Sequence, residues 1–533
     1  MLLDASCQPA GFSVLKRSLC AVACAIALGA GMDAALAGPA ATGGSHAIAW
    51  QVVAAPADVD KAFALARSSG KPVFLYWGAV WCPPCNQVKA TLFARPDFVE
   101  RSRAFVPVYV DGDKAGAQKV AARFKVSGYP TMIVFKPDGT EVTRLPGEVD
   151  PERYLMAMSA GLNAQVPVKE LVQRALARQA LTSEQWHLLA FYSWDTDEQQ
   201  LVAASQLPER LEQLAAATPP GFPDVRNRLA FKSLAARAEA DSPGDPATVS
   251  AGRSLAERVL TDEAATGQLA DIVVGQGEAL VKYLAPDPAP RRELAGHWDR
   301  ALARLIQSGL SNSDLVDALD TRVAMWKFID GSQELAPARR AEVMREVATI
   351  VARTTDRYER QAVVPGAAHT LTDAGLVDES DELLKFELPR AVAPYYHMLG
   401  LAGNAKKRND PKAALAWYEQ AWRTSQGEAT RIQWGANYVG RVAELTPDDV
   451  ARVDRAANSL IAQLKPRSDT FYERNVRTLT RMVGRLRQWQ GTKPDRIRVV
   501  EKLEQRFGHT CAQLPARDEG RANCEKVFWP KQS

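Results

Sequence analysis

Two cysteines that follow directly after an apolar run constrain the fold of this chain more than any other feature. The run is Val73–Trp77, and the motif behind it, Trp81–Cys85, has the sequence Trp-Cys-Pro-Pro-Cys. A continuous apolar run of this length is typical of a buried strand. The two thiols are therefore predicted to lie at the junction between this strand and the helix that follows it.

Alternating helix and strand patterns surround the motif. Apolar residues at helical spacing behind Asp58 predict a helix that ends at Gly70. Further apolar runs predict strands, and Pro137-Asp138-Gly139 is a hairpin turn signal. The expected strands cover 73–77, 105–110, 131–135 and 141–145, and further helices cover 115–124 and 151–160. This order predicts one α/β domain, assigned to residues 55–162.

The spacing of the two cysteines has a chemical use. The N-terminus of a helix carries about half a positive elementary charge, which stabilises a thiolate on the first cysteine. Such motifs lower the thiol pKa from about 8.5 to between about 3.5 and 7.5. The thiolate attacks a disulfide to form a mixed disulfide, which the second thiol resolves. Cys82 is therefore expected to be the nucleophile and Cys85 the resolving thiol.

The residues around the motif resemble the thioredoxin superfamily, most closely the C-terminal thioredoxin-like domain of bacterial thiol:disulfide interchange proteins. The matching segments are 71–73, 81–85, 91–93, 105–111 and 128–131. The resemblance implies a central mixed β-sheet flanked by helices, with thiol:disulfide exchange on protein cysteines. It also implies that Pro130 is a cis-proline facing the dithiol, and that Trp81, Tyr129 and Pro130 contact the substrate.

Two departures from the family pattern bear on the direction of electron flow. Tyr76 stands where thioredoxins carry a buried acid, and Pro107 aligns with the partner lysine. The buried proton relay of cytosolic reductants is therefore absent. Pro83 and Pro84 supply neither charge nor amide hydrogen to the thiolate, whereas strong oxidases carry a histidine between the cysteines. These features favour a reductase or isomerase over a strong oxidase.

The N-terminus has the three parts of a secretory signal peptide. A basic pair at 16–17 precedes a short apolar stretch, and Ala35-Leu36-Ala37 is a typical cleavage site. The stretch is shorter than the ~20 residues of a membrane span. The alternatives are an uncleaved anchor and, less favoured because of Ala21, a lipoprotein cut before Cys24. We therefore expect residues 1–37 to be removed on export to the periplasm, residues 38–54 to form a linker, and no integral membrane span to remain.

Cleavage leaves four cysteines, and an even count in an exported protein indicates disulfide chemistry. Besides the motif, these are Cys511 and Cys524, which are expected to form a structural disulfide that adds roughly 3 kcal/mol of stability. A second redox pair that exchanges with the motif is the alternative. A zinc site is disfavoured, because these two cysteines, with His509 nearby, do not form a matching ligand pair.

Strand signals end after Gln165. Segments rich in Ala, Leu, Arg and Glu predict an all-helical region over 166–505, followed by a tail over 506–533 that holds the second cysteine pair. Segments 374–384 and 409–422 each combine a turn of small residues with a helix, at a spacing similar to that of tetratricopeptide repeats. A generic helical bundle or solenoid is the alternative.

Other polar residues of the helical region are interpreted as structural. Arginines on one face of a predicted helix, opposite apolar residues, indicate a solvated face over a packed one; they are Arg474, Arg477, Arg481 and Arg485. Four histidines are interpreted as ordinary helix residues: His187, His297, His369 and His397. Neither a metal nor a cofactor is expected.

Composition excludes further classes. Apolar residues make up 46% and charged residues 24%, as in soluble globular proteins. A net charge of +4 over 533 residues lacks the dense basic footprint of a nucleic-acid-binding protein. The expected partners are proteins with cysteines or disulfides and a thiol redox partner, with the helical region holding the client. The competing function is a non-catalytic helical-repeat scaffold that carries a thioredoxin-fold binding module.

Overall fold

The computed structural model describes residues 47–145, 151–197, 200–240 and 244–529. The expected signal peptide and the first part of the expected linker lie outside these residues. Within the described ranges, no helix combines the length and the hydropathy that a bilayer crossing requires.

Five strands of the described residues form one mixed sheet in the order β1-β3-β2-β4-β5. β3 pairs in parallel with both β1 and β2, whereas β4 pairs antiparallel with β2 and β5. The strands are β1 (Gln51–Val53), β2 (Val73–Gly78), β3 (Val106–Asp111), β4 (Thr131–Phe135) and β5 (Glu141–Leu145). β1 corrects the expected linker over 38–54. Its three residues are too few to show an apolar pattern, and pairing with β3 holds them in the sheet.

Alternation along β2 divides the core of this domain into two layers, because successive strand side chains point to opposite faces. Val73, Leu75 and Trp77 pack with α2 (Pro56–Ser69) and α5 (Ala117–Phe124). Phe74 and Tyr76 face the other layer. That layer holds α3 (Pro83–Val88), the π-helical turn η1 (Lys89–Phe93), α4 (Pro96–Arg101), the 3-10 turn η2 (Ser102–Ala104) and α6 (Pro151–Asn163).

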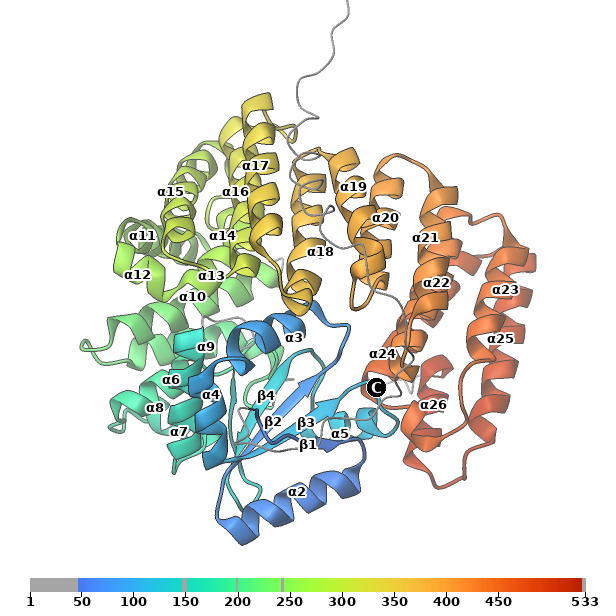
Figure 1. The fold of residues 1–533 in the computed structure, drawn as a ribbon, viewed down its shortest axis with the longest axis horizontal. Helices are drawn as coiled ribbons and strands as arrows, with labels where there is room; N and C mark the ends of the chain where they lie inside the picture. The colour runs from blue at the N-terminus through green and yellow to red at the C-terminus, as the bar shows by residue number, and fades with distance from the viewer. Residues whose placement is uncertain (1–46, 146–150, 198–199, 241–243, 530–533) are drawn as a thin grey trace, which may run out of the picture.

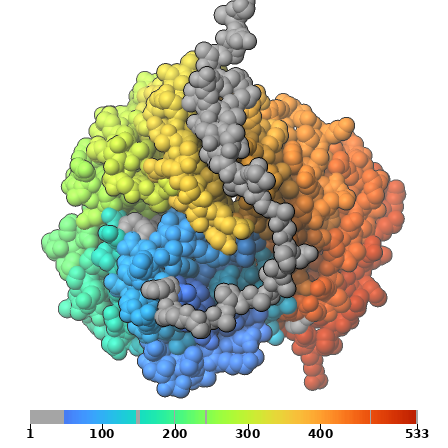
Figure 2. Space-filling model, viewed as in Figure 1, coloured from blue at the N-terminus to red at the C-terminus, as the bar shows by residue number. Residues whose placement is uncertain are grey.

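The rest of the described chain is helical. These helices form an arc that begins beside the sheet, passes above it and descends on its other side (Figure 1). Figure 2 shows the blue domain seated in the concavity of this arc. The helices are α7 (Val168–Leu176), α8 (Ser183–Ala190), η3 (Ala204–Gln206), α9 (Leu207–Ala217), α10 (Pro223–Glu239), α11 (Pro246–Thr261), α12 (Glu263–Gln268), α13 (Ala270–Gly275), α14 (Gly277–Leu284), α15 (Pro288–Gln307), α16 (Asn312–Asp330), α17 (Pro337–Arg353), α18 (Arg357–Asp373), α19 (Val377–Glu387), η4 (Leu388–Arg390), α20 (Tyr395–Lys407), α21 (Pro411–Thr424), α22 (Glu428–Leu445), α23 (Val450–Ile461), η5 (Ser468–Thr470), α24 (Glu473–Gln490), α25 (Pro494–Ala512) and α26 (Glu519–Phe528).

The two turns aligned as possible repeats occupy equivalent places. Gly375 lies between α18 and α19, and Asn409 lies between α20 and α21. Both have positive φ, 83° and 55°, a conformation that glycine and asparagine adopt more readily than other residues. Each turn therefore joins two contacting helices, as in a helix-pair array.

The C-terminal segment differs from the expected tail. Residues 506–533 include the end of α25 and all of α26, which pack on α24. Cys511 and Cys524 are joined by a disulfide and are 1% and 0% exposed. They belong to the same buried cluster as Cys82 and Cys85. One core therefore runs from the first domain into the last helices.

Candidate active site

Cys82 lies between β2 and α3, directly before the first residue of α3. It is the N-cap residue of α3, and Pro83 and Pro84 fill the first two helical positions. The prolines have no N–H, so the first backbone donor to reach the sulfur is the amide of Cys85, 3.2 Å from Cys82 Sγ. Cys82 and Cys85 are joined by a disulfide, with their Cα atoms 5.2 Å apart.

Tyr129 and Pro130 lie just before β4, and the peptide bond between them is cis. The Tyr129 ring lies between two tryptophans, with centroids 5.5 Å from Trp77 and 5.2 Å from Trp81. Gln118 donates a hydrogen bond to the Tyr129 hydroxyl at 3.3 Å. Burial raises the pKa of this hydroxyl, although the nearby Arg474 opposes the shift. The Tyr129 side chain is therefore uncharged and is held next to Trp81 by these contacts.

A groove of roughly 730 Å³ opens beside Cys82, between the first domain and the helical arc. It brings together Trp81, Cys82 and Tyr129 among the predicted site residues, whereas Cys85 and Pro130 do not line it. The first domain also contributes Pro83, Pro84 and Ser127; α20 contributes Tyr396, α22 contributes Gln433, Trp434, Ala436 and Asn437, and α24 contributes Arg474, Arg477, Thr478, Arg481, Met482 and Arg485.

Asp113, in the loop between β3 and α5, ties the two walls of the groove together. Its carboxylate accepts a hydrogen bond from Trp81 Nε1. It also accepts hydrogen bonds from the amide of Thr430 at 3.0 Å and from the Thr430 hydroxyl at 2.7 Å. Thr430 lies in the first turn of α22, so a side chain of the first domain satisfies a free helix amide of the second. Gly427, just before α22, permits this approach, because a Cβ there would lie 2.7 Å from Asp113 Cβ.

Arg474 pairs with this carboxylate. Its guanidinium lies 3.5 Å from Asp113, over the rings of Trp81 and Tyr129 at 4.6 and 5.3 Å, and it also donates to Gln433. Burial raises the pKa of Asp113, and Arg474 and the hydrogen bonds from Thr430 and Trp81 oppose that shift. The Asp113 carboxylate is thus largely buried, but its oxygens accept hydrogen bonds from Trp81 and Thr430 and pair with Arg474.

One of the four arginines on α24, Arg474, is a correction to the predicted solvated face. Arg474 is buried, 8% exposed, and pairs with Asp113, whereas Arg481 and Arg485 are exposed as predicted; all four arginines line the groove. The spacing along the helix was visible in the sequence. The site was missed because Asp113 and Cys82 are distant in the chain, and no local pattern links them to α24.

Aromatic residues occupy the layer beneath the dithiol. The rings of Tyr76 and Tyr109 stack at 5.3 Å, and Lys89 Nζ lies 5.7 Å from the Tyr109 centroid. Burial raises the pKa of both tyrosines and lowers that of Lys89. Pro107, aligned with the family's lysine, pairs in register with Phe74 instead of Tyr76. Neutral aromatic groups therefore stand where thioredoxins place an acid.

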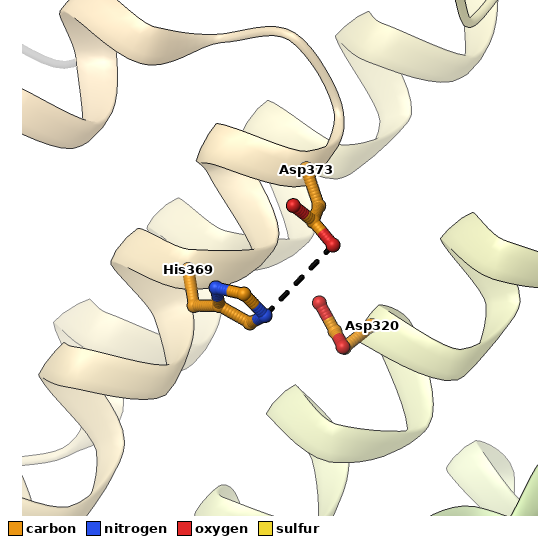
Figure 3. Close-up of side chains that lie close together, drawn as sticks. All are labelled: Asp320, His369 and Asp373. Carbon is orange, nitrogen blue, oxygen red and sulfur yellow. Dashed lines mark ion pairs between the residues drawn. The ribbon is translucent and has the colours of Figure 1, made fainter. Parts of the chain in front are cut away.

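A second cluster of chemistry-bearing side chains lies outside the groove (Figure 3). His369 and Asp373 of α18 face Asp320 of α16, with 3.8 Å between His369 Nε2 and an Asp373 oxygen. Burial raises the pKa of Asp320. Lys407 pairs with Asp373 at 3.3 Å. These groups are of the type that ligate metals, but Lys407 already supplies a cation. The one-turn spacing of His369 and Asp373 was the sequence signal that our interpretation of this histidine missed.

Residues 59–161 match the family model of the thioredoxin-like domain, so this part of the chain is a thioredoxin-like domain of the thioredoxin superfamily. Among curated proteins it is similar to the thiol:disulfide interchange protein DsbD. The identity is 33% over 122 residues with DsbD of Pseudomonas fluorescens, covering 22% of this chain and 21% of that protein. With DsbD 1 of Pseudomonas aeruginosa it is 34% over 127 residues, covering 23% and 21%.

The chain therefore matches about a fifth of the length of these relatives. Among solved structures, oxidised thioredoxin O2 from Arabidopsis thaliana is 24% identical, with a TM-score of 0.19. That match covers 21% of this chain and 93% of the thioredoxin.

Proposed function

We propose that the chain is an exported, periplasmic protein-disulfide oxidoreductase that acts as a reductase or isomerase. The observation that carries this proposal is the place of Cys82: its sulfur caps a helix and lines a groove beside Trp81 and Tyr129. The match of this domain to thiol:disulfide interchange proteins supports the same chemistry.

The proposed reaction moves two electrons from the dithiol to a client disulfide. The Cys82 thiolate attacks one client sulfur, so a mixed disulfide forms and the other client sulfur leaves as a thiolate. The Cys85 thiolate then attacks Cys82 Sγ. This step releases the reduced client and forms the Cys82–Cys85 disulfide. A protein dithiol partner returns the two electrons.

The backbone around Cys82 favours a reducing couple, whereas the arginines that line the same groove act in the opposite direction. A thiolate is stabilised by donors and positive charge, and each missing donor leaves its pKa higher. One backbone amide, that of Cys85, reaches Cys82 Sγ, because Pro83 and Pro84 have none to give. A less stabilised thiolate makes the disulfide a weaker oxidant, as the reductase assignment requires.

Insulin reduction by the chain without residues 1–37 tests the activity. The wild type should reduce insulin in the presence of dithiothreitol, and Cys82→Ala should be inactive. Cys85→Ala is the matched control, because it should retain Cys82 reactivity and accumulate mixed disulfides. Equal rates for the wild type and Cys82→Ala would support the competing scaffold function. Titration of the Cys82–Cys85 pair against glutathione gives its reduction potential, and a value near that of strong oxidases would refute the reductase assignment.

Export has its own test. Fractionation of the native host should find the protein in the periplasm, with a new N-terminus after Ala37. A cytosolic full-length protein would refute this part of the proposal.

A further inference from the structure

We propose that the groove beside Cys82 binds an acidic, extended segment of the client protein, and that α24 recognises it through Arg477, Arg481 and Arg485. The inference rests on the proposed function, because it concerns the class of protein that presents a disulfide to Cys82. It assigns a substrate-selecting role to part of the helical region.

The charge of the groove is strongly one-sided. Its lining includes four arginines and neither aspartate nor glutamate. Two of the four are matched: Arg474 by Asp113 at 3.5 Å, and Arg477 by Glu473 at 2.7 Å. Arg481 and Arg485 are exposed and form no ion pair within the described part of the chain. The groove therefore offers unmatched positive charge to whatever enters it.

The spacing of these arginines suits an extended chain. Arg477, Arg481 and Arg485 follow one another every four residues along α24, which separates them by about 6 Å on one face of the helix. In an extended peptide, side chains on one side recur about every 6.6 Å. Carboxylates at alternate positions of a client segment therefore meet successive arginines, and each Arg–carboxylate pair accepts a bidentate geometry.

The lining of the groove also includes aromatic side chains. Trp81 stacks on Tyr396 at 5.9 Å, and Tyr396 meets Trp434 edge-on at 5.6 Å. These rings cover apolar groups of a peptide next to its reactive cysteine. A volume of roughly 730 Å³ is that of a ligand-sized site, so it accepts a single peptide strand rather than a folded domain. The client is thus bound as a flexible or unfolded segment.

Peptide binding tests the inference without any redox step. Fluorescent peptides carry serine in place of the reactive cysteine and Glu-x-Glu, Gln-x-Gln or Lys-x-Lys on its N-terminal or C-terminal side. Fluorescence anisotropy measures their affinity for the oxidised protein. The Glu-x-Glu peptide of at least one side should bind about five- to tenfold more tightly than its Gln-x-Gln counterpart. High salt should abolish that preference, because it screens exposed charges.

Variants locate the effect on α24. Arg481→Glu/Arg485→Glu should reverse the preference towards Lys-x-Lys. Arg498→Glu is the matched control, since Arg498 is an exposed arginine on α25 that does not line the groove; it should leave the preference unchanged. Equal affinity of the Glu-x-Glu and Gln-x-Gln peptides on both sides would overturn the inference, as would an unaltered preference in the double variant.

Insulin reduction separates this inference from the proposed function. A protein that reduces insulin but binds all peptides equally refutes the acidic-client inference alone. A protein that prefers acidic peptides but is redox-inactive refutes the oxidoreductase proposal and leaves the groove assignment standing.

Discussion

Replacing Asp113 with alanine is expected to lower the free energy of unfolding by about 3–5 kcal/mol, the range for removing one partner of a buried ion pair. The Arg474 side chain is 10% exposed and that of Asp113 is 11% exposed. Without the carboxylate, Arg474 is a buried cation that keeps Gln433 as a hydrogen-bond acceptor but has lost its ion pair. Trp81 and Thr430 lose the acceptor of their hydrogen bonds. Each orphaned buried donor costs about 1–3 kcal/mol.

Urea unfolding followed by tryptophan fluorescence measures this loss. Asp60→Ala is the matched control: its 2.7 Å ion pair with Arg123 is exposed, 64% on the aspartate side. Such a pair contributes about 0–1 kcal/mol. The double variant Asp113→Ala/Arg474→Met removes the stranded cation but keeps an apolar cover over Trp81, so it should regain part of the stability. Equal losses for Asp113→Ala and Asp60→Ala would refute this account of the link, as would a double variant no more stable than Asp113→Ala.

Three further predictions concern titration, stability and reactivity. Burial lowers the pKa of His397 from 6.5 to about 4. Between these two values the folded protein binds fewer protons than the unfolded chain, so stability falls as the pH is lowered from about 6.5 towards 4. Urea unfolding at pH 7 and pH 5 should therefore show a smaller loss of stability in His397→Gln than in the wild type. Cys511→Ala/Cys524→Ala should lose about 3 kcal/mol, because the disulfide closes a loop between residues 13 apart; an unchanged midpoint in thermal unfolding would contradict this. In the reduced protein, iodoacetamide should label Cys82, which lines the groove, before Cys85, which does not; mass mapping showing Cys85 labelled first would reverse their assigned roles.

Much of the thioredoxin-like domain could be predicted because its central strands β2 and β4 are buried on both faces. All six residues of β2 are buried, so the strand forms an unbroken apolar run in the sequence. β4 and β5 begin and end where their patterns predict. β1 could not be predicted, since its burial pattern has a single buried residue, Val53, and its conformation comes from pairing with β3.

The dithiol was visible because its chemistry is local: two cysteines, two prolines and the strand before them lie in one short segment. The groove was not, because its other wall comes from α20, α22 and α24. The arginine face of α24 is readable as a pattern, but Asp113 and Trp81, the partners of Arg474, belong to another part of the chain. The short helix α26 could likewise not be predicted, because the role of its apolar residues is apparent only from their packing on α24.

Because the groove is formed by segments far apart in the chain, its two parts are synthesised at different times. During synthesis the dithiol segment emerges long before α24, so Cys82 and Cys85 exist as an uncovered pair while the arginine wall has yet to be made. Under the proposed function, a newly made thioredoxin-like domain would lack the arginines that select its clients. The selectivity for acidic clients that we propose would therefore begin only once α24 is in place against Trp81 and Asp113.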